Sequence, residues 1–311
     1  MVGATGVVGE TILRVLEERR VPIARLGAFA SRPRSAALTF HGNVLDVTVA
    51  SEESLRDFDV VFFAGGEDAS ERLVPALEAR GAVVIDNSPT FRMRENVPLV
   101  IPEVNAGTIA PEHRVFPVAN CTAIILCMAL APLRDVAGLR AVRIATYQAV
   151  SGAGRAALEE FDRGEGSLIG NVVPQIGSLD ERGESGEERK VREETRKMLG
   201  LPDLFVGVTC VRVPVRTAHS EAVFFETERE TCVADLAGAL ERARSIVFHR
   251  EGVVTPREVE GSDQVHVARL HAIGGSANEF SLWCVGDQLR KGAATNAVQI
   301  LELLLEKGYV A

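Results

Sequence analysis

The chain has 311 residues, of which 46% are hydrophobic and 25% charged, and its formal net charge is −9 with a sequence pI of about 5.3. This composition is typical of a globular protein that is long enough for two domains. The acidic balance, without any local basic stripe, argues against a nucleic-acid partner, whose phosphates would be repelled.

A glycine-rich turn, GATGVVG at residues 3–9, leads directly into a predicted amphipathic helix. Glycines let a backbone approach a pyrophosphate closely, and the positive N-terminus of a helix attracts the anion. The same pattern also fits a tight strand-to-helix turn that binds nothing. Only Met1 and Val2 precede the turn, whereas a dinucleotide-binding unit needs a strand of about five residues there. We therefore expect either a first strand reduced to a stub or a native start upstream of Met1.

Strands and helices alternate after this turn. Residues 24–31, 44–50, 59–65 and 82–88 read as strands, and residues 69–81 read as a helix. This alternation predicts a parallel sheet of the dinucleotide-binding kind.

The loop ASRPRSA at residues 30–36 indicates which dinucleotide would bind. An acidic residue is expected near this point for NAD, because it holds the ribose 2′-hydroxyl. This chain instead has two cations and two hydroxyls, which suit the 2′-phosphate of NADP: Ser31, Arg32, Arg34 and Ser35. A solvated basic loop without a ligand is the alternative.

The stretch PVANCTAIILCMALAPL at residues 117–133 contains two cysteines in different positions. If a helix begins at Asn120 or Cys121, Asn120 caps it and the sulfur of Cys121 lies in the positive field of the helix N-terminus. That field lowers the pKa of a thiol and favours the reactive thiolate. Cys127 falls in mid-helix among apolar residues and should be an inert buried thiol. Both could also be core cysteines, which is the commoner fate of this residue.

The cysteine count and the lengths of the apolar runs indicate the cellular compartment and bear on metal and membrane binding. Five cysteines, an odd number, in a long chain without a secretory signal indicate free thiols in a reducing, cytoplasmic setting. No clustered His and Cys spacing suggests a metal site, so we expect none. The longest apolar run, Cys121 to Leu133, is too short to span a bilayer, and we expect no membrane partner.

In the second half of the chain, predicted strands and helices do not alternate regularly. Strands are predicted at residues 140–150, 204–215, 220–228, 265–274 and 279–287. Helices are predicted at residues 186–200, 235–247 and 289–308, and a turn with a helix at residues 151–161.

RVPVRTAHSE at residues 212–221 supplies a possible partner for a cysteine nucleophile, which needs a general acid/base within hydrogen-bond reach. His219 is the histidine in the most crowded polar stretch, although a lone histidine is more often structural. Arg212 could bind a carboxylate in bidentate fashion or form a surface ion pair. Gln148, at a predicted strand end, could orient a substrate or tie down a loop.

Taken together and in order, these segments resemble the aspartate-semialdehyde dehydrogenase family. The matching segments run from residue 3 to residue 300: GATGVVG, DNSPTFRM with VPLVIPEVN, ANCTA, TYQAVSGAG, EERK, RVPVRTAHSE and KGAATNAVQI. The resemblance implies NADPH-dependent reductive dephosphorylation of L-aspartyl 4-phosphate to L-aspartate 4-semialdehyde through a cysteine thioester. The pathways implied are the biosynthesis of lysine through diaminopimelate, and of threonine, methionine and isoleucine.

The resemblance also implies roles for individual residues. Cys121 matches the nucleophile, His219 the acid/base and Gln148 the glutamine that orients the intermediate. The residues that match the substrate and phosphate set are Arg92, Asn120, Glu187, Lys190 and Arg212. The residues that match the cofactor-binding set are Gly3, Thr5, Gly6, Val7, Val8, Ser31, Arg34, Ser35, Ser151, Gly152 and Asn296. The 2′-phosphate loop departs from the SxRSAG pattern of the family by what reads as one inserted residue, which leaves Arg32 or Arg34 to meet the phosphate.

The implied fold is α/β: a Rossmann-type dinucleotide-binding domain plus an α+β catalytic and dimerisation domain. The expected domains are residues 1–119 with 291–311 for NADP, and residues 120–290 for catalysis and dimerisation, with a homodimer as the implied assembly. Two alternatives remain at this stage. One is N-acetyl-γ-glutamyl-phosphate reductase, for which an acidic partner of a free amine such as Glu187 is less expected. The other is a non-catalytic dinucleotide-binding paralogue.

Overall fold

The computed structural model describes residues 1–32 and 38–310. The chain divides into two compact units, Met1–Ala119 together with Ala293–Ala311, and Asn120–Gly292. Within the described residues, none of the helices combines the length and the apolar character that a membrane span requires.

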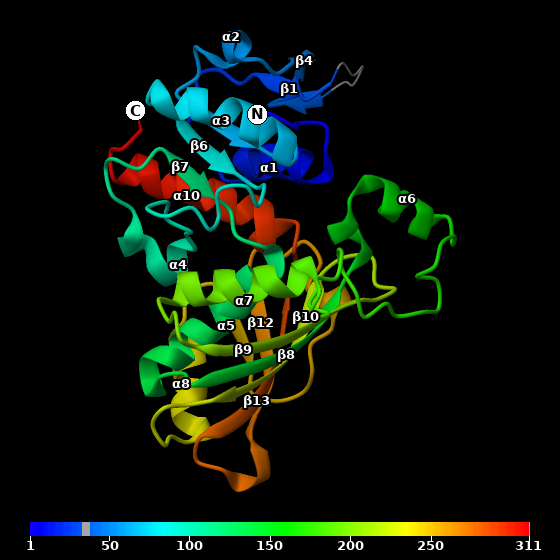
Figure 1. Cartoon of the computed structure of the whole chain (residues 1–311), viewed down its shortest axis with the longest axis vertical. Helices are drawn as coiled ribbons and strands as arrows, with labels where there is room; N and C mark the ends of the chain where they lie inside the picture. The colour runs from blue at the N-terminus through cyan, green and yellow to red at the C-terminus, as the bar shows by residue number, and fades with distance from the viewer. Residues whose placement is uncertain (33–37, 311) are drawn as a thin grey trace. The chain divides into compact units, whose positions relative to one another are not determined.

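The first unit is built on a parallel sheet (Figure 1). Its strands are β1 (Ala28–Ala30), β4 (Val47–Val49), β5 (Val60–Phe63), β6 (Val83–Asp86) and β7 (Val115–Pro117). β1 pairs with β4, and β5, β6 and β7 pair in that order. Val2 joins the two runs, because it bridges Phe29 of β1 and Phe63 of β5 in the parallel sense. In this structure the expected first strand is thus a single bridging residue.

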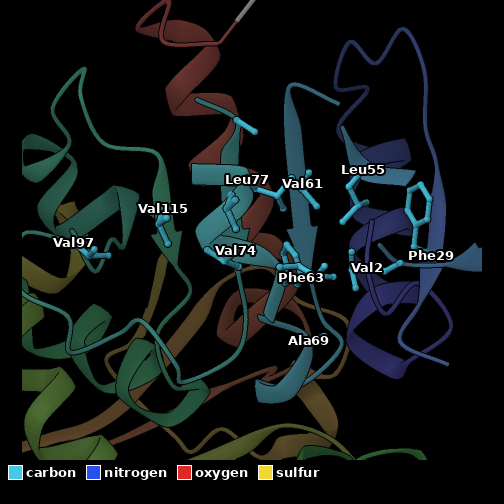
Figure 2. Packing of buried hydrophobic residues seen from close by; sticks show 14 residues of the cluster. Val2, Phe29, Leu55, Val61, Phe63, Ala69, Val74, Leu77, Val97 and Val115 are labelled. Atoms are coloured by element: carbon cyan, nitrogen blue, oxygen red, sulfur yellow. The ribbon is translucent and has the colours of Figure 1, made fainter. Parts of the chain in front are cut away.

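Helices and one small hairpin complete this unit. The helices are α1 (Val7–Glu18), α2 (Glu52–Leu55), α3 (Glu67–Ala79), α4 (Pro102–Asn105), the 3-10 turn η1 (Ala106–Thr108) and α10 (Thr295–Glu306). α3 and α10 both pack against β6, and α10 also packs against α1. Figure 2 shows the apolar cluster around Val2, Phe63 and Leu77, to which α2 and α3 contribute side chains together with the strands. The C-terminal helix therefore completes the sheet unit that the N-terminal residues begin.

The predicted strand at residues 44–50 is two strands in the structure. β3 (Asn43–Leu45) pairs antiparallel with β2 (Leu38–Phe40), whereas β4 pairs parallel with β1. The chain changes partner at Asp46, so one continuous strand cannot satisfy both ladders.

The second unit contains a six-stranded mixed sheet in the order β11-β12-β13-β10-β8-β9. The strands are β8 (Ala141–Gln148), β9 (Phe205–Arg212), β10 (His219–Glu226), β11 (Ile246–His249), β12 (Val265–Ala272) and β13 (Glu279–Gly286). β10 runs antiparallel to both of its neighbours, β8 and β13, and β8 pairs parallel with β9. His219, the first residue of β10, and Gln148, the last residue of β8, therefore lie side by side at the same end of the sheet.

Helices cover one face of this sheet (Figure 1). They are α5 (Cys121–Ala137), α7 (Gly186–Leu199) and α8 (Val233–Arg242), while η2 (Val150–Ala153), α6 (Arg155–Asp162), α9 (Pro256–Val259), the 3-10 turn η3 (Ile273–Gly275) and a π-helical turn (Arg290–Ala294) lie in the connections. α5 packs against α7, α8, β12 and β13, and almost all of its residues are buried. The first turn of α5 is thereby fixed between sheet and helices.

The prediction of helix through residue 247 was wrong at its end. α8 stops at Arg242, and Ile246–His249 form strand β11 beside β12. Ala243 already has extended backbone angles (φ −72°, ψ 131°), so the helix ends there, and the β-branched and aromatic residues after Ser245 favour a strand.

Candidate active site

The glycine turn forms part of the wall of a cavity of about 620 Å³ in the first unit. Gly3 has φ +80°, and a Cβ there would lie 2.5 Å from the carbonyl carbon of Ala64, so this position admits only glycine. Gly6 is the N-cap of α1 and no side chain caps this helix, whose first turn begins with Val7 and Val8. A turn of this shape suits a pyrophosphate, because it combines close backbone approach with a helix N-terminus.

The same cavity is lined by Thr5, by Ser31 and Arg32 at the end of β1, and by Asp68 and Arg72 of α3. Arg34 and Ser35, which the sequence pointed to, lie outside the described residues. Sequence reasoning missed Asp68 and Arg72, although α3 follows β5 directly and its first turns belong to the same edge of the sheet.

Two further predicted site residues belong to the first unit and are buried there. The guanidinium of Arg92 donates to the carbonyl oxygens of Val118 (Nε, 2.8 Å) and Asn87 (Nη2, 2.9 Å). Asn296, on α10, donates from Nδ2 to the carbonyl oxygen of Val100 at 2.9 Å. Both side chains are thus held in fixed orientations by backbone oxygens.

In the second unit, Cys121 is the first residue of α5 and Asn120 is its N-cap, as expected. Oδ1 of Asn120 accepts hydrogen bonds from the backbone N–H of Thr122 (3.0 Å) and Ala123 (3.2 Å). Cys121 is half-buried at this helix N-terminus, where the helix dipole favours a thiolate. Cys127 is fully buried and burial raises the pKa of its thiol, so it stays protonated.

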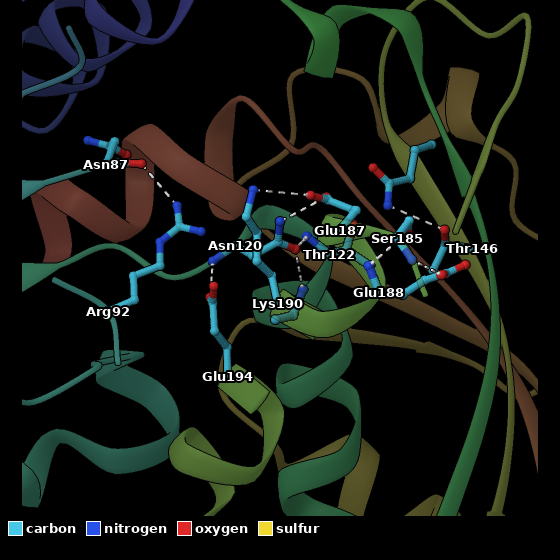
Figure 3. Close-up of polar contacts among 12 residues, drawn as sticks. Asn87, Arg92, Asn120, Thr122, Thr146, Ser185, Glu187, Glu188, Lys190 and Glu194 are labelled. Atoms are coloured by element: carbon cyan, nitrogen blue, oxygen red, sulfur yellow. Dashed lines mark hydrogen bonds and ion pairs between the residues drawn. The ribbon is translucent and has the colours of Figure 1, made fainter. Parts of the chain in front are cut away.

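Helix α7 holds the cap residue from the other side (Figure 3). Nδ2 of Asn120 donates to Oε1 of Glu187 at 2.8 Å, and the backbone N–H of Asn120 donates to Oε2 of Glu194 at 2.5 Å. Lys190, one turn along, lies 3.9 Å from the Glu187 carboxylate. Glu187, Lys190 and Asn120 thus form one connected polar group beside the start of α5.

His219 begins β10 and is fully buried. Its Nδ1 accepts the backbone N–H of Ala149 at 3.0 Å, so the neutral ring carries its proton on Nε2. Within the described part of the chain, Nε2 has no hydrogen-bond partner. Burial, with a further contribution from Arg212, holds the pKa of His219 well below 6.5. A neutral imidazole whose Nε2–H has no partner among the described residues can act as a donor at that atom.

Arg212 ends β9 directly beside Gln148, its register partner on β8. Its Nη1 donates to the carbonyl oxygen of Ala149 at 2.6 Å, so Ala149 anchors both Arg212 and His219. Burial lowers the pKa of Arg212, and the interaction with Cys121 is the largest that raises it. Arg212 is therefore the common neighbour of the thiol and the imidazole. Gln148 is buried, and its Nε2 donates to Oγ1 of Thr146 at 3.3 Å.

The SGAG turn packs against these groups. A Cβ at Gly152 would lie 3.1 Å from Nη1 of Arg212 and 3.2 Å from Nε2 of His219, so a side chain there would crowd both. Ser151 accepts a hydrogen bond from Nε2 of Gln288, whose Oε1 accepts the N–H of Ala218 at 2.9 Å. Ala218 precedes His219 with φ 69°, which non-glycine residues rarely adopt. Gln288 thus ties the turn to the strained residue before the histidine.

Gly292, in the π-helical turn, lies close to Cys121. A Cβ at this position would lie 3.0 Å from the Cβ of Cys121. The glycine leaves room for the cysteine side chain at the start of α5.

Glu221 lies two residues after His219, so both side chains point to the same face of the sheet. It is fully buried; Oε2 accepts a hydrogen bond from the thiol of Cys284 at 3.3 Å, and Oε1 has no partner among the described residues. Burial raises the pKa of Glu221 from 4.5 to about 8, so the group is mostly a neutral acid at pH 7.

This buried acid predicts a pH-dependent stability. Because the folded protein keeps a proton that the unfolded chain releases, the free energy of unfolding falls as the pH rises from about 4.5 to about 8. Between pH 5 and pH 8 we expect Glu221 to contribute a loss of roughly 3–4 kcal/mol, at about 1.4 kcal/mol per pKa unit. Glu221→Gln should remove this component, measured as the difference between variant and parent in denaturant unfolding across that range.

Glu226→Gln, on the same strand, is the matched control, since its carboxylate is partly exposed and paired with Arg140. Equal pH dependence in parent and Glu221→Gln would contradict the assignment of a neutral buried acid.

The second unit thus collects most of the predicted catalytic set: Cys121, Asn120, Gln148, Ser151, Gly152, Glu187, Lys190, Arg212 and His219. Sequence reasoning missed Glu194, Gln288 and Gly292. Across residues 1–32 and 38–310, no cluster of His, Cys, Asp or Glu has the arrangement of a metal site.

Two family models match the chain in succession. Residues 1–111 match "Semialdehyde dehydrogenase, NAD binding domain", and residues 130–291 match "Semialdehyde dehydrogenase, dimerisation domain". These ranges fall within the two compact units.

Individual relatives match over nearly the whole chain. The aspartate-semialdehyde dehydrogenase of Bacillus subtilis is 38% identical, with 98% of this chain and 96% of the relative covered. That of Aquifex aeolicus is also 38% identical, with coverages of 100% and 98%. The crystal structure of aspartate semialdehyde dehydrogenase II from Vibrio cholerae superposes with a TM-score of 0.91 at 36% identity, with 98% of this chain and 97% of that chain covered.

Proposed function

The chain belongs to the aspartate-semialdehyde dehydrogenase family, and we propose that it converts L-aspartyl 4-phosphate to L-aspartate 4-semialdehyde with NADPH, through a thioester on Cys121. Its family makes it an oxidoreductase of amino-acid biosynthesis with a Rossmann-type cofactor domain. The observation that carries the mechanism is the shared neighbourhood of Cys121, Arg212 and the unoccupied Nε2 of His219.

Cys121 acts first in this proposal. As a thiolate at the N-terminus of α5, it attacks the acyl carbon of the substrate, the C–O bond to phosphate breaks, and a thioester forms. The guanidinium of Arg212 and the helix dipole both favour the thiolate over the thiol. Asn120 keeps the nucleophile in place, since it caps the helix and is itself bonded to Glu187.

His219 is the proposed proton donor. In its neutral form it carries a proton on Nε2 and can donate it as a hydrogen bond to the oxygen of the tetrahedral thiohemiacetal; the proton stays on the imidazole when the thiohemiacetal collapses to the aldehyde and the Cys121 thiolate. Gln148, buried beside Arg212, is proposed to orient the acyl group.

Charged and polar groups near Asn120 are proposed to bind the α-carboxylate, the α-ammonium group and the phosphate of the substrate. Arg212 is proposed to bind the α-carboxylate and Glu187 the α-ammonium group. Lys190, Asn120 and Arg92 are proposed to bind the phosphate. The Vibrio cholerae relative, 35% identical, was solved in a complex with ASA, which supports a small-molecule substrate of this class.

The first unit fits a dinucleotide. When bound, NADPH supplies the hydride that reduces the thioester. Gly3, Thr5, Gly6, Val7 and Val8 are proposed to meet the pyrophosphate, because the turn has glycine-only geometry and opens a helix. Ser31 lines the same cavity and Arg34 and Ser35 follow it in sequence, which favours NADP over NAD; Ser151, Gly152 and Asn296 are proposed to lie near the nicotinamide.

The assembly proposed is a homodimer formed through the second unit, which matches a dimerisation domain. The sheet face opposite α5 exposes Tyr147 (38%), Phe224 (46%) and Phe205 (53%), large apolar side chains that a second copy could cover. We further propose a cytoplasmic enzyme of lysine (through diaminopimelate), threonine, methionine and isoleucine synthesis, in keeping with five free thiols.

Substrate choice tests this function. In the reverse direction, with phosphate and NADP, we expect kcat/KM for L-aspartate 4-semialdehyde to exceed that for N-acetyl-L-glutamate 5-semialdehyde by about 100-fold or more. The reason is that the Glu187 carboxylate would lose its cationic partner when the amine is acetylated. Initial rates of NADPH formation measure this ratio, and repetition with NAD gives the cofactor preference. Preference for the acetylated aldehyde would instead assign N-acetyl-γ-glutamyl-phosphate reductase.

A further inference from the structure

Helix α7 presents two carboxylates to the same residue. Glu187 and Glu194 are seven positions apart, about two helical turns, and therefore project from the same face of α7. Glu187 accepts the side-chain amide of Asn120, whereas Glu194 accepts its backbone N–H (Figure 3). Only the first of the two is placed to meet a substrate under the proposed function.

Glu194 is 1% exposed, which is unusual for a carboxylate. A buried charge is tolerated when strong hydrogen bonds compensate for the lost hydration, and the 2.5 Å contact with the Asn120 N–H is short even for a charge-assisted bond. Its position is specific, because this N–H belongs to the residue immediately before Cys121. The bond spans 74 positions of sequence and connects two helices.

The cap residue is therefore held at each of its polar groups. Its side-chain oxygen binds the first turn of α5, its side-chain nitrogen binds Glu187 and its backbone nitrogen binds Glu194. The peptide between Asn120 and Cys121 is held by the first bond of the helix, from the N–H of Ile124 to the carbonyl oxygen of Asn120 at 2.9 Å. The Glu194 bond fixes the preceding peptide, between Ala119 and Asn120, and so fixes both sides of the cap residue from which Cys121 continues.

We propose that Glu194 is a positioning residue for the nucleophile: through the Asn120 peptide it fixes the start of α5 and the placement of the Cys121 thiolate. The inference rests on the proposed role of Cys121. A misplacement of about 1 Å at a reacting atom can cost on the order of 100-fold in rate, so the effect should fall on kcat.

Three variants of Glu194 and one control test this role. Glu194→Ala removes the acceptor, Glu194→Asp withdraws it by one methylene while keeping the charge, and Glu194→Gln keeps an oxygen acceptor in place. Glu193→Ala is the matched control, because its neighbouring carboxylate is more exposed and paired with Arg192. Steady-state kinetics with L-aspartate 4-semialdehyde, phosphate and NADP give kcat and each KM, and circular dichroism melting gives the folded fraction.

We expect kcat to fall by about 100-fold in Glu194→Ala and about tenfold in Glu194→Asp, with KM values within about threefold of the parent. Glu194→Gln should recover most of the loss, and Glu193→Ala should match the parent. A purely structural role would lower the melting temperature without this division between kcat and KM. If Glu194→Ala does not fold, Glu194→Asp decides.

A kcat within twofold of the parent in folded Glu194→Asp would overturn the proposal. That failure is separable from failure of the proposed function, which would instead show as turnover retained in Cys121→Ser.

Discussion

Cys121→Ser should abolish turnover while the protein stays folded. A serine hydroxyl at the start of α5 is not ionised by the helix dipole and Arg212 as a thiol is, because its pKa lies far higher. We expect kcat to fall by on the order of 10⁴-fold or more, the scale seen when a covalent nucleophile is removed. Initial rates of phosphate-dependent NADPH formation measure the loss, and circular dichroism checks the fold.

Cys127→Ser is the matched control, six positions along the same helix. Its thiol is buried, and burial keeps it protonated, so it takes no part in the chemistry and kcat should stay within about threefold of the parent. Substantial activity in Cys121→Ser, or loss of activity in Cys127→Ser with an intact fold, would show that Cys121 is not the nucleophile.

His219→Asn should reduce kcat by about 10²–10⁴-fold, less than the loss in Cys121→Ser. The oxygen of the asparagine can still accept the Ala149 N–H, but this shorter side chain has no donor at the position of Nε2. Because burial and Arg212 hold the pKa of His219 well below 6.5, protonation of this histidine should depress kcat of the parent only below that pH. The pH profile of kcat for both proteins measures the effect.

His266→Asn is the control for the loss of an imidazole from the same sheet. His266 lies on β12, where it pairs with His249 at 3.1 Å. We expect its kcat to match the parent, since its contacts involve none of the proposed catalytic groups. A His219→Asn enzyme with unchanged kcat would remove the acid/base assignment.

Local rules predicted the parts of the site that depend on a few neighbouring residues. Asn120 caps α5 because an asparagine precedes a long apolar run, and that placement alone separates Cys121 from Cys127. The glycine turn was also predictable from neighbouring residues alone, because its motif requires a positive φ that glycine adopts easily, and Gly3 has that φ.

Long-range contacts were not predictable in this way. Glu194 lies 74 positions from Asn120, and Gln288 lies 137 positions from Ser151. Such contacts depend on how helices and strands pack, and neither residue stands out in a single sequence from other polar side chains. Glu194 belongs to a charge-rich helix that reads as a solvated surface, yet its position in the helical repeat faces the cap of α5.

The predicted strand boundaries were wrong where the chain changes from one pairing strand to another. Residues 44–50 read as one strand because their side chains favour extended structure throughout, but β3 and β4 belong to different ladders. Local propensity does not carry information on pairing partners.

The most direct test of the account is reduction of NADP by the purified protein with L-aspartate 4-semialdehyde, followed through NADPH absorbance with and without phosphate. A parallel sample is alkylated with iodoacetamide, and the labelled cysteine is identified by mass spectrometry. The account predicts turnover that requires phosphate and that disappears in proportion to modification of Cys121. Turnover that proceeds without phosphate, or that survives complete modification of Cys121, would contradict thioester chemistry at this residue.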